Sequence, residues 1–76
     1  MNKILILANA IPGHKYKILS INAGWGLKAR LLQMGLVPGS EVIVLENNWG
    51  RVLIEVRGSI IALSRGMARK IIVSPQ

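Results

Sequence analysis

Side chains able to perform acid–base or nucleophilic chemistry are few in this chain, and they are widely spaced. There is one histidine, His14, with three acidic residues and no cysteine. The acids are Glu41, Glu46 and Glu55. Each lies in or beside a predicted strand with basic neighbours, so surface pairing with lysine or arginine is the simplest expectation. Neither Ser20 nor Ser40 has a spacing from His14 that indicates a nucleophile–base pair. We therefore expect no enzymatic activity.

Metal and nucleotide sites are not indicated either. A transition-metal site in a protein usually takes three or more His, Cys, Asp or Glu ligands, and a single histidine with scattered glutamates does not supply them. His14 follows Pro12-Gly13 and is typical of an exposed turn. The Gly24-Trp25-Gly26 stretch lacks the strand–turn–helix context of a dinucleotide site. We expect no metal and no cofactor.

The charge balance points to a macromolecular partner. Ten lysines and arginines against three acids give a net charge of +7. Such a domain suits nucleic acid, an anionic membrane face or an acidic protein, although solubility alone is an equally simple reason for the charge. The basic residues form no continuous run, so the sequence favours a protein partner over nucleic acid.

Both tryptophans are expected near the surface, because glycine-flanked turns and hairpin tips seldom enter a core. An exposed indole beside basic residues suits a protein-binding hot spot or a base-stacking platform. The alternative is that each ring covers the open end of a small barrel. The candidate contact residues are Trp25, Lys28, Arg30, Gln33, Trp49 and Arg51.

The segment RLLQMGLVPGSEV, residues 30–42, joins two kinds of element. Leu27, Leu31 and Met34 follow the spacing of an amphipathic helix of about three turns. Gly35 stands where a helix ends in the left-handed conformation, and Leu36 can fold back onto the last turn. Pro38-Gly39 then opens a turn into the next strand.

Strands are predicted near residues 16–21, 41–46, 51–57, 60–63 and 71–73, with tight turns at 47–50 and 58–59. Ser64 or Gly66 could begin one helical turn. Five strands this short favour a small, partly closed barrel, mainly β, with one helix inserted after the first strand. The outer faces are also apolar, so some of Ile43, Leu45, Ile60 and Ile72 should be exposed unless the helix and residues 4–11 cover them. We expect a single domain over residues 1–76.

The N-terminal ILILA stretch is too short for a signal-peptide core, and no segment has the length of a membrane span. These observations predict a soluble, cytoplasmic protein.

Two motifs at the right separation resemble the ferrous iron transport protein A (FeoA) family: RLLQMGLVPGSEVIV at residues 30–44 and EVRGSIIAL at residues 55–63. The resemblance runs from about Leu7 to Val73 and implies an SH3-like barrel. A proline common in the family after the mid-barrel hairpin is absent here, where Arg51 and Val52 stand. The positions that match the family motif, which we interpret as structural, are Leu31, Met34, Gly35, Leu36, Pro38, Gly39, Gly58, Leu63 and Ala68.

The resemblance implies a partner rather than a reaction. Family members accompany a membrane ferrous-iron transporter that carries a cytoplasmic GTPase domain. The predicted function is therefore an interaction module on that GTPase domain. A small basic nucleic-acid-binding barrel is the alternative, and a homo-oligomer is compatible with either. The same domain also occurs in metal-dependent repressors, but this chain has no helix-turn-helix segment.

Overall fold

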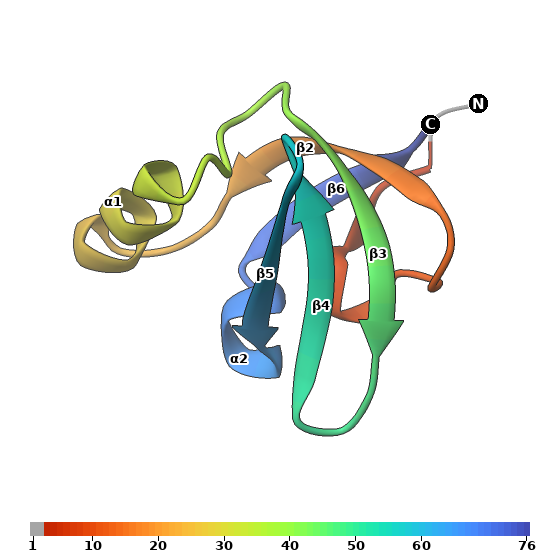
Figure 1. Ribbon diagram of the computed structural model, residues 1–76. Coiled ribbons are helices and arrows are strands. Elements are labelled where there is room, and N and C mark those ends of the chain that lie inside the picture. The colour runs from red at the N-terminus through yellow and green to blue at the C-terminus, as the bar shows by residue number, and fades with distance from the viewer. Residues whose placement is uncertain (1–2) are drawn as a thin grey trace.

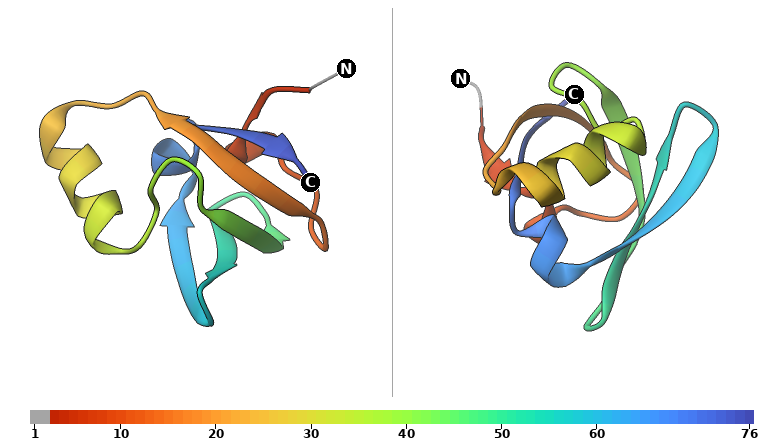
Figure 2. Two further views of the ribbon diagram at one scale, coloured as in Figure 1. Left: turned by 90° about the horizontal axis from the view of Figure 1, so that it is seen from above. Right: turned by 90° about the vertical axis from the view of Figure 1, so that its left-hand side faces the viewer.

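The computed structural model describes residues 3–76 as one antiparallel sheet that bends strongly on itself, with a helix projecting from one end (Figures 1 and 2). The strand order is β1-β6-β2-β3-β4-β5, and the sheet remains open between its two edge strands. The elements are β1 (Leu5–Ile6), a 3₁₀ helix η1 (Leu7–Asn9), β2 (Lys15–Ile21), α1 (Trp25–Gln33), β3 (Glu41–Asn47), β4 (Arg51–Val56), β5 (Ser59–Ser64), α2 (Arg65–Ala68) and β6 (Ile71–Pro75).

The predicted fold class, a mainly β SH3-like barrel with an inserted helix, is confirmed. One difference concerns the N-terminal segment. Leu5 pairs with Val73 and Ile6 with Ile72, which adds a short strand, so the described residues contain six strands instead of five. The helix α1 consequently follows the second strand.

The stretch after β1 belongs to the core. Leu7, Ala8 and Ala10 are almost completely buried, and η1 packs against β6 and α2. Of the apolar residues that imitate a short signal peptide, Leu7 and Ala8 therefore fill the interior of the barrel, whereas Ile4 is 66% exposed.

The end of α1 has the geometry of a Schellman motif. The amide of Leu36 donates to the carbonyl of Leu31 at 3.0 Å, and the amide of Gly35 donates to the carbonyl of Leu32 at 3.0 Å. Gly35 has φ +91°, which confirms the predicted left-handed position. Leu36 is fully buried, so the helix stop also inserts a side chain into the core.

Tight turns connect the remaining strands. Gly39 has φ +95° inside a turn closed by the bond from the Ser40 amide to the Val37 carbonyl. The β4–β5 turn consists of Arg57 and Gly58, with φ +52° and +82°, as the primed hairpin turns require. The prediction of a Gly58-Ser59 turn was therefore displaced by one residue.

Strand β2 departs from strict alternation of buried and exposed residues. Tyr16 and Ile18 are buried, but the register shifts between Ile18 and Ser20. Because of this bulge, Ile21 faces the interior in the place that strict alternation gives to Ser20.

The core is aliphatic and continuous. Leu31, Leu36, Leu63 and Ala68, four of the positions that match the family motif, are fully buried. The outer side of the sheet keeps part of its apolar surface: Ile60 is 64% exposed. Ile43, Leu45 and Ile72 are half-buried.

Candidate functional site

The loop between β3 and β4 presents Trp49 to solvent with 96% of its surface exposed. Asn48 closes this loop: its Oδ1 accepts hydrogen bonds from the amides of Gly50 and Arg51, both at 3.3 Å. The backbone amide of Asn48 also donates to the carbonyl of Arg51 at 3.1 Å. An ordered turn thus holds the indole outward, and the alternative that this ring covers the end of the barrel is wrong.

Below the loop, Asn47 connects β3 to the N-terminal segment. Its Nδ2 donates to the carbonyls of Ala8 at 2.9 Å and Ala10 at 2.8 Å. Its Oδ1 accepts a hydrogen bond from the guanidinium of Arg65, the first residue of α2. Asn47 was predicted to lie in the hairpin turn at residues 47–50. The structure instead places it at the end of β3, half-buried and saturated with hydrogen bonds.

Arg65 makes further hydrogen bonds to the segments that Asn47 connects. Its guanidinium also donates to the carbonyl of Asn48 at 3.1 Å and to that of Ala8 at 3.2 Å. The side chain therefore binds the hairpin loop, η1 and α2 together. All three acceptors are neutral oxygens, so these bonds fix the guanidinium without cancelling its charge.

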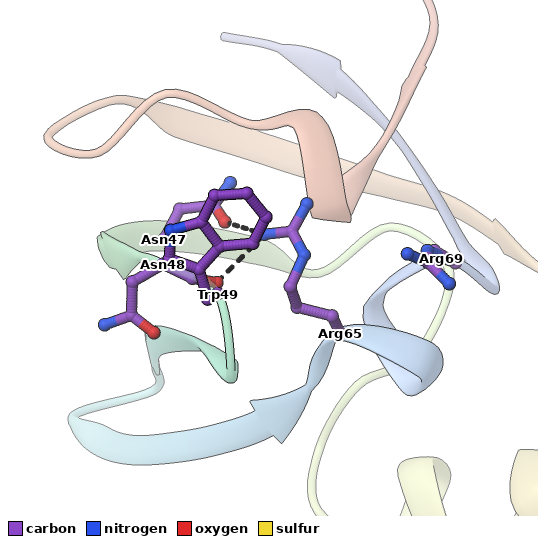
Figure 3. Close-up of a pocket in the computed structure, with 5 residues that line it drawn as sticks. All are labelled: Asn47, Asn48, Trp49, Arg65 and Arg69. Carbon is purple, nitrogen blue, oxygen red and sulfur yellow. Dashed lines mark hydrogen bonds between the residues drawn. The ribbon is translucent and has the colours of Figure 1, made fainter.

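A cleft of about 570 Å³ opens between the hairpin loop and α2, lined by Asn47, Asn48, Trp49, Arg65 and Arg69 (Figure 3). Arg69 is exposed and stands at the C-terminal end of α2. Two arginines and an exposed tryptophan therefore line the same cleft. We name this group the hairpin cleft. Its chemistry suits an anionic group that lies next to an apolar or planar one.

The other candidate contact residues lie on α1. Trp25 is 76% exposed at the start of the helix, so this ring does not cover the barrel either. Arg30 and Gln33 are exposed and Lys28 is half-buried. Figure 1 shows α1 projecting to one side, apart from the β3–β4 loop. The six predicted contact residues therefore form two surfaces, one on α1 and one at the hairpin, where Trp49 and the exposed Arg51 lie.

Sequence reasoning missed Asn47, Arg65 and Arg69. A signal for Arg65 was nevertheless present in the pairing of β4 with β5. From the Arg57–Gly58 turn the register runs outward to the pair of Arg51 with Ser64. The next step places Arg65 opposite the hairpin loop. The turn was predicted at Gly58-Ser59, one residue too late. This error hid the position of Arg65 opposite the hairpin loop, because a shift of one residue in register moves every side chain to the other face of the sheet.

Other kinds of site find no support in the part of the chain that is described. Within residues 3–76, no group of three or more His, Cys, Asp or Glu side chains is placed to hold a metal ion. His14 is exposed, as expected for its turn. Over the same residues, no helix has the length and hydrophobicity needed to cross a membrane.

A bent antiparallel sheet with a helix after β2 defines a small SH3-like barrel. The chain belongs to the FeoA family, since a family profile described as the FeoA domain matches residues 6–75. A relative from Methanocaldococcus jannaschii, named "Putative Fe(2+) transport protein A", is 43% identical over 67 residues, covering 88% of this chain and 82% of the relative.

Solved structures agree with this assignment. The crystal structure of an iron uptake regulatory protein (FeoA) matches with a TM-score of 0.92 and 31% identity, over 97% of this chain and 100% of that one. A manganese-dependent transcriptional repressor matches with a TM-score of 0.90 over 100% of this chain and 44% of its own. Its identity is 16%, so that likeness shows the fold alone.

Proposed function

We propose that this chain is a cytoplasmic accessory protein of ferrous iron transport that binds the GTPase domain of the membrane ferrous-iron transporter. The observation that carries the proposal is the FeoA family match over residues 6–75. The exterior supports it, since two exposed tryptophans stand on separate projections of a chain with net charge +7. Tryptophan and arginine are the residues that most often dominate protein-binding energy.

The basic exterior contributes mainly to encounter and orientation. A positive surface that approaches an acidic one accelerates association and fixes register more than it adds affinity. Binding to the GTPase domain should therefore weaken as salt rises, because exposed charges more than about 10 Å apart are largely screened at 0.1 M ionic strength, and this distance shortens with added salt.

The test is calorimetric titration of the full-length protein with the isolated GTPase domain. Arg30→Glu should lower the affinity, while the melting temperature shifts little because Arg30 is exposed. Lys28→Glu, at a half-buried position, should lower the affinity as well. Lys70→Glu, an equal change of charge at an exposed position outside the proposed contacts, is the matched control. Full affinity in the Arg30 and Lys28 variants would remove α1 from the interface, and absence of binding by the unmodified protein would overturn the proposal.

A nucleic-acid-binding function is the second candidate, because an exposed indole beside guanidinium groups can also stack a base. It predicts affinity for single-stranded RNA or DNA that falls steeply between two salt concentrations. Filter binding at those concentrations separates the two functions, since the protein-binding proposal predicts no saturable retention of either nucleic acid.

A further inference from the structure

We propose that the hairpin cleft is a binding site for an acidic peptide segment, in which a carboxylate meets Arg69 and Arg65 and a neighbouring apolar side chain packs on Trp49. The inference rests on the proposed function only for the identity of the protein that carries the segment.

The first support is an excess of positive charge in the cleft. Its lining contains two arginines and no carboxylate. Glu46 is the acidic residue nearest along the chain, and its Oε1 accepts from the Asn48 Nδ2 at 3.5 Å rather than from either guanidinium. An anion entering the cleft therefore meets charges that the lining itself does not neutralise.

The second support is that Arg65 is preorganised and still has donors to offer. A guanidinium has five N–H donors. Three are used, to Asn47 Oδ1 and to the carbonyls of Asn48 and Ala8, which leaves two. Because these bonds already order the side chain, a ligand that accepts from the remaining donors meets little further entropy cost.

The third support is the geometry of Trp49. The ring is almost fully exposed, yet its loop is closed by the hydrogen bonds of Asn48. A large apolar surface that remains in solvent on an ordered turn favours an apolar contact as well as an ionic one. A free phosphate would use only the arginines, whereas a peptide that combines an acid with an apolar residue uses the whole lining (Figure 3).

The experiment is an NMR titration of the ¹⁵N-labelled full-length protein. The chain has two tryptophans, so the spectrum contains two indole N–H signals, which Trp25→Phe assigns. The probe is a capped hexapeptide of alternating glutamate and leucine. We expect a saturable shift of the Trp49 indole, with the Trp25 indole unchanged.

Three comparisons make the result specific. Replacing each glutamate of the peptide by glutamine should abolish the shift. Arg69→Glu should weaken binding by about tenfold or more, since hydrogen bonds to charged groups are the strong ones. The matched control, Arg30→Glu on α1, makes the same change in net charge and should alter binding by less than about twofold. Arg65 is left intact because it also holds the fold together.

Several outcomes would overturn the inference: equal binding of the glutamine peptide, a shift of Trp25 in place of Trp49, or equal losses from the Arg69 and Arg30 variants. Stronger shifts with inorganic phosphate or a single-stranded oligonucleotide would show a site for phosphate instead. The GTPase domain separates this inference from the proposed function. Peptide binding without domain binding overturns only the proposed function, and domain binding that leaves Trp49 unshifted overturns only the inference.

Discussion

The two projections that carry the tryptophans differ in how they are attached to the barrel. At the hairpin, Asn47 and Arg65 bond to η1 and to the loop, which joins segments far apart in the sequence. At the other projection, α1 has Gly24 at its N-cap without a side-chain cap, and Leu31 is its one fully buried residue. Figure 2 shows this helix lying off the side of the bent sheet.

Two exposed tryptophans can therefore stand on supports of different rigidity. In the hairpin cleft, hydrogen bonds hold the side chains of Asn47, Asn48 and Arg65 before any partner arrives, which lowers the entropy cost of binding. The orientation of α1 depends on the fully buried Leu31, on the partly buried Leu27 and Met34, which pack against the core, and on the helix stop at Gly35. We therefore expect the hairpin to be the more rigid of the two proposed contact surfaces, and substitutions at both surfaces test that expectation.

The largest effect is expected from Leu31→Ala. Truncating a fully buried leucine costs about 2–5 kcal/mol of the free energy of unfolding. Because Leu31 is the one fully buried residue of α1, the amides of α1 should lose their protection from hydrogen exchange first, with the β3–β4 amides retaining theirs. Equal loss of protection in both regions would show that α1 and the barrel form a single cooperative unit.

The second-largest effect is expected from Asn47→Ala. The free energy of unfolding should fall by about 2–3 kcal/mol, because the carbonyls of Ala8 and Ala10 each lose a donor. Asn48→Ala is the matched control and should cost about 1 kcal/mol or less, since its bonds lie within the exposed loop. Urea denaturation measures both. Equal costs would mean that Asn47 does not support the hairpin as described.

Two glycine substitutions, one within α1 and one just after it, should change the free energy of unfolding by smaller amounts and in opposite directions. Gly35→Ala should destabilise by about 1 kcal/mol because φ +91° is unfavourable for alanine. Gly26→Ala, inside the helix and with open space around the position of the new Cβ, should stabilise by up to about 1 kcal/mol. Thermal denaturation compares them, and a destabilising Gly26→Ala would contradict our description of the helix.

The smallest effects are expected from Trp25→Ala and Trp49→Ala. Exposed side chains away from caps and buried networks change the free energy of unfolding by about 0.5 kcal/mol or less. A substantially larger loss for either variant would show that its ring packs on the barrel after all. Urea denaturation of the two proteins side by side is sufficient.

Local signals predicted much of the fold. The spacing of Leu27, Leu31 and Met34, followed by Gly35, indicated a helix and its stop because the whole motif lies within a few consecutive residues. Ser64 was one of two predicted starts for α2, and its Oγ does accept from the Met67 amide at 3.2 Å. Such motifs are readable because every group involved is close in sequence.

Features that depend on distant partners were not predictable in the same way. The β2 bulge is defined by pairing with β6, which the sequence of β2 alone does not reveal. Asn47 finds its partners 37 and 39 residues earlier and 18 residues later. Its role appears only once β3, η1 and α2 are assembled, and that is why the candidate site was predicted without its supporting residues.

The central claim is that this barrel acts through contacts of its exterior with the GTPase domain. The most direct test is to titrate that domain into the ¹⁵N-labelled protein and to follow both indole signals. We predict a saturable complex that shifts the signals of Trp49 and Trp25 and weakens with salt. If both signals stay in place at saturating concentrations of the domain, the claim is wrong.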